Sequence, residues 1–293
     1  MNKKLWQLEA LRGAAAIYVV IYHANFFSQS IIAPLFSMGP EAVILFFILS
    51  GFVISHSSEN RLRLPGGTAT YLVHRFRRIY PLFLFSLFFA YSIQCVVHQK
   101  LLSIEIYSLV GNLLMMQDLA WMKAGSFCNS YCENAPLWSL SYEWWFYLAF
   151  IPVLKIAQRL QYSVALTLSF VGSLSYAFIP SQIGLFAGYF FLWWSGVELA
   201  RQYRSETKVS FSGQWKTLLG LLLLGAAWSL PVVLAASRGD QLRLGFEPII
   251  QVRHVIAAIA FVSVGIAWYQ WRMIGFKQLL GPLRYAAPIS YAL

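Results

Sequence analysis

Residues 12–24, RGAAAIYVVIYHA, form an apolar run that opens with Arg12 and holds His23 near its far end. Runs of similar length recur along the whole chain, and a helix needs about 20 apolar residues to cross a bilayer. Only 11% of the 293 residues are charged, against about 25% in ordinary globular chains. The sequence therefore predicts an all-α fold, a polytopic transmembrane helical bundle.

Hydrophobic periodicity predicts about eight complete spans and the start of a ninth. The predicted spans are residues 13–32, 41–57, 79–97, 137–154, 162–178, 183–200, 216–236 and 254–271, with a ninth helix starting near residue 285. Segment 104–122 is different, because polar residues interrupt its short apolar core. We expect it to be a re-entrant or surface helix on the outer face.

Charge distribution predicts the orientation. With the N-terminus inside and 104–122 not crossing, 17 of the 22 Lys and Arg residues fall in inner segments, as the positive-inside rule favours. A crossing at 104–122 would divide them almost evenly. The net charge of +11 then reflects cytoplasmic loops and anionic lipid rather than nucleic acid. We expect a multi-pass protein of the inner (plasma) membrane with a cytoplasmic N-terminus.

Two of the three cysteines, Cys128 and Cys132, lie in the predicted outer loop SFCNSYCENAP. An oxidising exterior favours a disulfide between them, and two free thiols are the alternative. A metal site is not expected, because no histidine lies nearby to complete one. Cys95 sits in an apolar run and is interpreted as a packing residue.

Arg12 and His23 are separated by about 16 Å and three turns on a helix, so they share one face. Ionisable residues at membrane depth usually mark a functional site. Each has a simpler interpretation as well. Arg12 could anchor the helix by reaching lipid phosphate, and His23 could be a ring satisfied by neighbouring helices.

A second basic cluster, HRFRRIYP (74–81), leads into the third predicted span. Arg75 and Arg78 share a helix face, whereas Arg77 points elsewhere. Guanidinium groups beside the free N–H groups of a helix N-terminus suit an anion. The alternative is simple anchoring on the inner side. Upstream, Gly51 in FFILSGFVIS indicates close helix packing.

A third feature is APLWSLSYEWWFYL (135–148), which places Glu143 about two turns into a span from the outside. A bare carboxylate at that depth is costly unless it is paired or protonated. Ser139 lies on the same helix face as Glu143. The alternative is that Glu143 only neutralises a structural arginine.

Four motifs in order, R-x10-H, FFILSGFVIS, RFRRIYP and PLWSLSYEWWFYL, resemble the integral-membrane acyltransferase 3 family. The resemblance covers residues 5–152 and returns in LLGPLRYAAPISYAL at the end of the chain. Members of this family typically transfer an acetyl or other short acyl group from acyl-CoA to cell-surface glycans. The resemblance therefore implies acetyl-CoA as co-substrate and a carbohydrate as acceptor.

Carried over position by position, the resemblance assigns roles to the polar residues singled out above. The residues expected to bind acyl-CoA are Arg12, Arg75 and Arg78, and the expected catalytic residues are His23 and Glu143. His23 would act as the general base on the acceptor hydroxyl, because neutral imidazole titrates near working pH. Ser139 and Ser141 are candidate substrate-binding hydroxyls that could stabilise the oxyanion.

The chain departs from the family pattern at Ile44, where members often have a polar residue, and at its end. Residues 1–293 read as a single membrane acyltransferase domain that stops within the ninth helix, so we expect it to be C-terminally incomplete. Two other functions remain open. A helical bundle with central charges also suits a transporter or exporter of a glycan or lipid, and a non-catalytic membrane protein would tolerate loss of His23 and Glu143.

Overall fold

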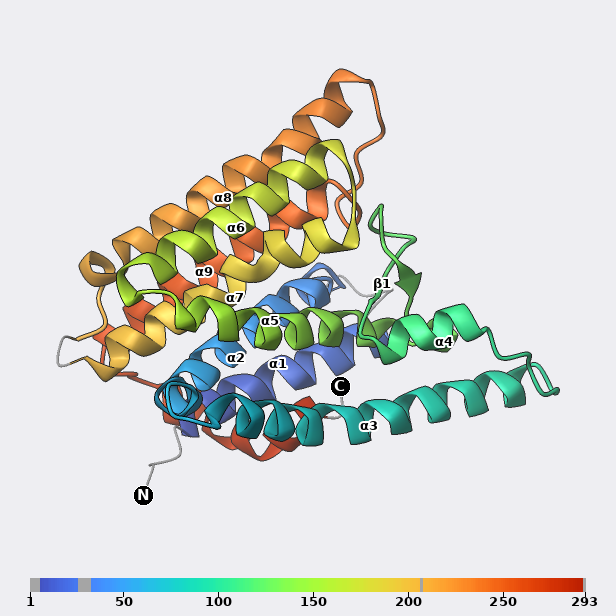
Figure 1. Cartoon of the computed structure of the whole chain (residues 1–293), viewed down its shortest axis with the longest axis horizontal. Coiled ribbons are helices and arrows are strands. Elements are labelled where there is room, and N and C mark those ends of the chain that lie inside the picture. The colour runs from blue at the N-terminus through green and yellow to red at the C-terminus, as the bar shows by residue number, and fades with distance from the viewer. Residues whose placement is uncertain (1–5, 26–32, 206–207, 292–293) are drawn as a thin grey trace. The chain divides into compact units, whose positions relative to one another are not determined.

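The computed structural model describes residues 6–25, 33–205 and 208–291 (Figure 1). Helices dominate these residues, and a two-residue parallel strand pair is the one piece of sheet among them. The α-helices are α1 (Trp6–Ala24), α2 (Gly39–Leu62), α3 (Gly67–Val97), α4 (Ile106–Leu113), α5 (Trp138–Lys155), α6 (Gln158–Phe178), α7 (Gln182–Arg204), α8 (Phe211–Ser237), α9 (Ile249–Gln270) and α10 (Phe276–Leu279). The strands are β1 (Gln117–Asp118) and β2 (Cys128–Asn129), and the 3₁₀ segments are η1 (Ala33–Phe36), η2 (Tyr131–Glu133), η3 (Ala135–Leu137) and η4 (Gly281–Tyr291).

Each complete predicted span corresponds to one α-helix, which confirms the helical-bundle class. Five of them, α2, α3, α7, α8 and α9, are long and apolar enough to cross a membrane by length and composition. Helices α5 and α6 form where predicted, whereas α1 begins at Trp6 and not at residue 13. All three carry several polar side chains, and they are not among these five helices. Residues 26–32 of the first predicted span lie outside the described residues.

Segment 104–122 does not form a spanning helix. Its helix α4 has 8 residues, which is about 12 Å of rise, whereas the hydrocarbon core is about 30 Å thick. The chain then turns into β1, which pairs in parallel with β2 through Gln117 and Cys128. The polar residues that interrupt this segment, Asn112, Gln117 and Asp118, are fully buried and hold the irregular segment together.

Two further elements differ from prediction. Helix α3 begins at Gly67 rather than near residue 79, because a helix backbone continues through the basic stretch before the apolar run starts. The predicted ninth α-helix is replaced, over the described residues, by the 3₁₀ segment η4. Two prolines, Pro282 and Pro288, lie within η4, and proline cannot donate the backbone hydrogen bonds of an α-helix.

The chain divides into two compact units. The first unit comprises Met1–Ser57, Leu192–Leu223 and Arg253–Leu293, and the second comprises Ser58–Phe191 and Leu224–Val252. Each is described by itself below.

In the first unit, α2 and α7 approach each other at the level of their backbones. A Cβ atom on Gly51 would lie 2.0 Å from the carbonyl oxygen of Trp193, and one on Gly196 would lie 1.9 Å from that of Ile48. Any larger side chain would separate the helices at both points. The predicted packing role of Gly51 is thereby confirmed, and Gly196 is its counterpart on the facing helix.

A buried ion pair joins α2 to α9 in the same unit. The Arg253 guanidinium lies 2.6 Å from Oε1 of Glu41, whose side chain is 3% exposed. Burying a carboxylate without a cation is costly, so this contact stabilises both charges. Sequence reasoning did not single out Glu41, although an acidic residue at the start of an apolar helix was a usable signal.

In the second unit, aromatic side chains of α5 form the centre of the core. Tyr142, Phe146 and Phe150 are buried, and the Tyr142 ring packs edge-on against Phe186 of α7 at 4.9 Å. Helix α3 instead keeps large apolar side chains exposed, with Phe88 68% exposed. Such a face suits contact with lipid tails, in agreement with a membrane protein.

Candidate functional site

A cluster on α3 and α5 brings together two of the polar residues that the sequence singled out. The Arg75 guanidinium carbon lies 5.4 Å from the centre of the Tyr71 ring and 5.6 Å from that of Tyr147. The Tyr147 hydroxyl donates a hydrogen bond to Oε1 of Glu143. Tyr147 therefore lies between the arginine of one helix and the carboxylate of the other.

Local helix geometry explains how this cluster forms. Tyr71 and Arg75 are four residues apart on α3, and Glu143 and Tyr147 are four apart on α5, so each pair shares a helix face. The Tyr71 hydroxyl also donates to the backbone carbonyl of Tyr147 at 3.4 Å, which ties the two helices together. Sequence reasoning missed Tyr71 and Tyr147, although i±4 spacing from Arg75 and Glu143 was the signal that could have found them.

The cluster is largely enclosed. Tyr71 is 5% exposed and Tyr147 is 1% exposed, whereas Arg75, Arg78 and Glu143 are half-buried. Arg77 is exposed, as predicted from its position on a different face. Cation–π attraction to the two rings stabilises the Arg75 guanidinium. Its N–H groups lie in one plane, and in this position they can still donate hydrogen bonds to an anion.

The position of Arg75 and Arg78 along α3 corrects one prediction. Because α3 starts at Gly67, Arg75 lies about two turns inside the helix. The free backbone N–H groups of the helix N-terminus are therefore not beside these arginines. Any anion held here would depend on side chains, not on the helix terminus.

The two serines of α5 hydrogen-bond to backbone carbonyls. Ser141 is fully buried, and its Oγ lies 2.7 Å from the Trp138 carbonyl and 2.8 Å from the Gln117 carbonyl. Ser139 donates to the Pro136 carbonyl at 3.3 Å and is half-buried. The hydroxyl of Ser141 thus links α5 to β1, and an oxyanion-stabilising role for either serine stays a prediction.

Arg12 and His23 both lie on α1, in the first unit. The His23 imidazole is exposed and lies edge-on to the Tyr22 ring at 5.1 Å. Within the described residues no protein group hydrogen-bonds to the His23 ring, so its nitrogens are open to a substrate. Arg12 is half-buried. A Cβ atom on the neighbouring Gly13 would lie 1.9 Å from the Leu283 carbonyl oxygen, so α1 lies directly against η4.

The predicted residues therefore fall into two groups. The α1 pair belongs to the first unit, and the α3 and α5 residues belong to the second. Within the second group, Arg75 and Glu143 meet at Tyr147, whereas the two serines hydrogen-bond to backbone carbonyls elsewhere. In the part of the chain that the structure describes, no three His, Cys, Asp or Glu side chains gather as a possible metal site.

The predicted disulfide is not formed, since Cys128 and Cys132 are both free thiols. Cys128 is buried against α4, where the Asn112 side-chain amide lies 3.7 Å from its sulfur. The backbone carbonyl of Cys132 instead accepts a 3.4 Å hydrogen bond from Gln94 of α3. Cys128 lies in the paired strand β2 and contacts α4, whereas Cys132 follows a turn and contacts α3. The two residues therefore lie against different helices.

These features define a helical membrane protein with a basic, aromatic and acidic cluster between two helices. The sequence model of the acyltransferase 3 family, described as an acyltransferase domain, matches residues 5–293. The chain belongs to that family.

Two curated relatives are similar over part of their length. Acyltransferase MdmB of Streptomyces mycarofaciens is 31% identical over 156 residues, which is 50% of this chain and 38% of the relative. Protein 2 in picA locus of Rhizobium radiobacter is 39% identical over 87 residues, or 27% of this chain and 40% of the relative. The similarity thus spans about two fifths of each relative. No solved structure matches the chain.

Proposed function

We propose that the chain is a membrane-embedded O-acyltransferase that moves an acetyl or other short acyl group from cytoplasmic acyl-CoA to a hydroxyl of a cell-envelope glycan. Membership of the acyltransferase family supports the reaction class. The observation that carries the assignment to a site is the meeting of Arg75 and Glu143 at the Tyr147 ring. The protein would lie in the inner (plasma) membrane with its N-terminus in the cytoplasm.

Arginine side chains would hold the donor. Arg75 and Arg78 share a face of α3, and Arg12 lies near the start of α1. Planar guanidinium groups bind phosphate oxygens through two parallel hydrogen bonds, which suits the phosphates of coenzyme A. The two tyrosine rings around Arg75 fix the orientation of its fork.

The transfer itself needs a base. In our proposal the acceptor hydroxyl oxygen attacks the thioester carbonyl carbon while Nδ1 or Nε2 of His23 takes the hydroxyl proton. The new C–O bond forms, the C–S bond breaks, and the coenzyme A thiolate leaves and recovers a proton. The exposed His23 ring, with no hydrogen-bond partner among the described residues, suits this role. Glu143, held by Tyr147, would orient the acceptor.

Paired arginine variants test the donor site. Full-length protein in nanodiscs is titrated with radiolabelled acetyl-CoA, and acyl transfer is measured as ester-linked label on envelope glycan added from cells that lack the gene. Arg75→Lys keeps the charge but loses the two-pronged donor, so binding should weaken about tenfold or more. Arg77→Lys, the exposed neighbour on the same helix, is the matched control and should bind normally.

The outcome separates this proposal from its rivals. Equal acetyl-CoA affinity in Arg75→Lys, Arg77→Lys and wild type would remove the donor-binding role of Arg75. A wild-type protein that moves glycan across the membrane without forming an ester would instead be a transporter.

A further inference from the structure

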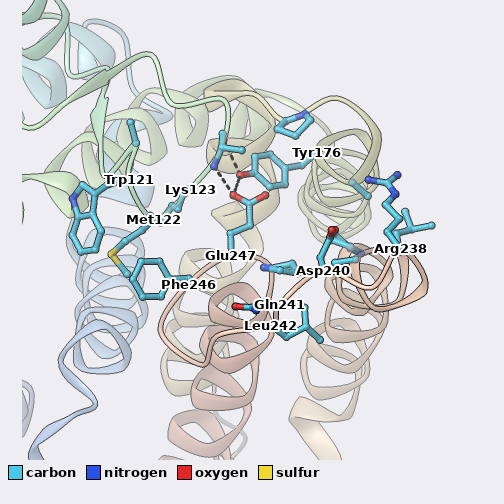
Figure 2. A pocket seen from close by; sticks show the side chains of 18 residues that line it. Trp121, Met122, Lys123, Tyr176, Arg238, Asp240, Gln241, Leu242, Phe246 and Glu247 are labelled. Carbon is cyan, nitrogen blue, oxygen red and sulfur yellow. Dashed lines mark hydrogen bonds between the residues drawn. The ribbon is translucent and has the colours of Figure 1, made fainter.

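The second unit contains a cavity whose lining includes none of Arg75, Glu143 and Tyr147. Its volume is about 460 Å³, within the range of roughly 300–1,000 Å³ that is typical of small-molecule sites. Residues 120–124, the C-terminal ends of α6 and α8, and the connection from α8 to α9 form its walls. Figure 2 shows Glu247 at its centre.

Glu247 is fixed by contacts on one side only. Its Oε2 accepts hydrogen bonds from the Tyr176 hydroxyl at 2.7 Å and from the backbone N–H of Ala124. The Glu247 backbone N–H donates to the Met122 carbonyl at 3.2 Å. Within the described residues Oε1 has no protein partner, so the cavity contains an oriented carboxylate oxygen that can accept a hydrogen bond from a ligand.

Residues 122–124 form one wall of the cavity, and the buried amino group of Lys123 anchors this wall to the core. Its Nζ lies 2.8 Å from Oδ1 of Asp118 and 3.8 Å from the centre of the Trp138 ring, and its side chain is 1% exposed. The Tyr142 hydroxyl donates to the other oxygen of Asp118 at 2.5 Å. The backbone of residues 122–124 is therefore held in place before any ligand arrives, which lowers the entropic cost of binding.

The cavity has an aromatic side and a polar side. Trp121, 61% exposed, lies edge-on to Phe246 with the ring centres 5.9 Å apart. Figure 2 shows these rings on one side of Glu247 and the side chains of Asp240 and Arg238 on the other. Aromatic faces with a few oriented polar groups are the usual lining of a site for a small polar molecule.

This lining suits a neutral sugar. The C–H face of a sugar ring can pack on the indole, because the aromatic face carries partial negative charge. Carboxyl oxygens accept hydrogen bonds, so Glu247 and Asp240 can accept them from the hydroxyl groups of a sugar. The lining also holds Arg238, so its opposite charges largely balance, which suits a neutral ligand better than a strongly anionic one such as the phosphates of coenzyme A.

Chain topology gives independent support for the same occupant. Residues 120–124, the end of α6 and the connection from α8 to α9 all lie in segments that the charge distribution predicts on the outer side of the membrane. A glycan acceptor would arrive from that side. We propose that this cavity binds a neutral sugar unit of the acceptor glycan, an inference that rests on the proposed acyltransferase function.

A binding experiment without acyl-CoA tests the site. Fluorescently labelled full-length protein in nanodiscs is applied to a saccharide array that carries neutral, amino-sugar and acidic glycans. We expect wild type to bind neutral glycans, and Trp121→Ala and Glu247→Gln to bind them about tenfold more weakly. Trp215→Ala, an exposed tryptophan at the start of α8, is the matched control and should bind as wild type does.

Glu247→Gln keeps an oxygen acceptor for the Ala124 N–H, so the loop should remain folded, and thermal unfolding of each variant checks this. Absence of neutral-glycan binding by wild type, or binding that neither variant changes, overturns the proposal. Acyl transfer with an unchanged KM for glycan in Trp121→Ala would reject this site while leaving the acyltransferase function standing. Binding that depends on Trp121 and Glu247 in a protein without transferase activity would support the site and reject the function.

Discussion

The Tyr147 hydroxyl donates a hydrogen bond to the carboxylate of Glu143, one turn away on α5, while the Tyr147 ring centre lies 5.6 Å from the Arg75 guanidinium carbon. One tyrosine thus connects a basic residue of α3 with an acidic residue of α5. Arg75 and Glu143 are each half-buried, and the Tyr147 side chain between them is 1% exposed. The arrangement makes the tyrosine a positioning residue, since it would act through Arg75 and Glu143 and not on the reacting atoms.

Tyr147→Phe should lower acyl transfer about tenfold or more, because it keeps the ring above Arg75 but removes a hydrogen bond to a charged group, worth about 1.5–3 kcal/mol. Acetyl-CoA affinity should change little. Tyr269→Phe on α9 is the control, as the Tyr269 hydroxyl makes no hydrogen bond among the described residues. A Tyr147→Phe enzyme with wild-type turnover would reduce Tyr147 to packing.

His23→Gln should abolish transfer while acetyl-CoA binding persists. Glutamine is similar in size and can hydrogen-bond, but it takes no proton near neutral pH. Loss of a general base typically costs about 10²–10⁴ in rate. Single-turnover formation of labelled ester, measured beside a binding titration, separates the two effects. Normal ester formation by His23→Gln would return this ring to a packing role.

Cys128 should react slowly with maleimide at neutral pH and faster as the pH rises. Burial, with a further contribution from the Asp118 charge, raises the pKa of the Cys128 thiol to about 11. Only the thiolate is nucleophilic, so about a thousandth of the thiol is reactive at about pH 8. The rate should climb steadily up to about pH 10.

The measurement uses a protein that carries Cys95→Ser and Cys132→Ser, labelled with a membrane-impermeant maleimide in intact cells. Fast labelling that does not depend on pH would contradict the buried position of Cys128. Labelling that requires an opened membrane would reverse the predicted topology.

Gly51→Ala and Gly196→Ala should each destabilise the first unit. The added Cβ atoms would lie 2.0 Å and 1.9 Å from carbonyl oxygens of the facing helix, and overpacking of this kind costs about 1–3 kcal/mol. Thermal unfolding in detergent should show a decrease of several degrees. Gly265→Ala on α9 is the matched control, because no described atom outside its own stretch of helix lies within 4 Å of where its added methyl group would be. Equal unfolding temperatures for all three variants would disprove the close approach of α2 and α7.

Lys123→Met should destabilise the protein strongly, because it leaves the Asp118 carboxylate buried without its cation. Breaking a buried ion pair costs about 3–5 kcal/mol. Adding Asp118→Asn removes the unpaired charge and keeps an acceptor for the Tyr142 hydroxyl, so the double variant should recover part of the loss. Thermal unfolding of the two variants measures the difference. A double variant less stable than Lys123→Met would show that the charge on Asp118 has another cation partner.

The sequence by itself determined the class of fold. Long apolar runs leave the backbone no partner in lipid except its own helix, so every complete predicted span became a helix. Motif order indicated the family, and the sequence placed Arg75 with Arg78 on one helix and Arg12 with His23 on another, as α3 and α1 show. Helix ends were less predictable. Helix α3 starts at Gly67, before its apolar run. Hydropathy could not predict this start, because it indicates which residues suit lipid and not where the helical backbone hydrogen bonds begin.

Only the tertiary structure decided which distant residues meet. Nothing in local periodicity pairs Arg75 with Tyr147, Glu41 with Arg253, or Lys123 with Asp118 and Trp138, since such contacts depend on how separate helices and loops pack. The same is true of the free thiols of Cys128 and Cys132, where the β1–β2 pairing and its turn send two nearby residues to different helices. The cavity around Glu247 arises in the same way, because its walls come from segments as far apart in sequence as Ala124 and Glu247, and only folding brings such segments to one place.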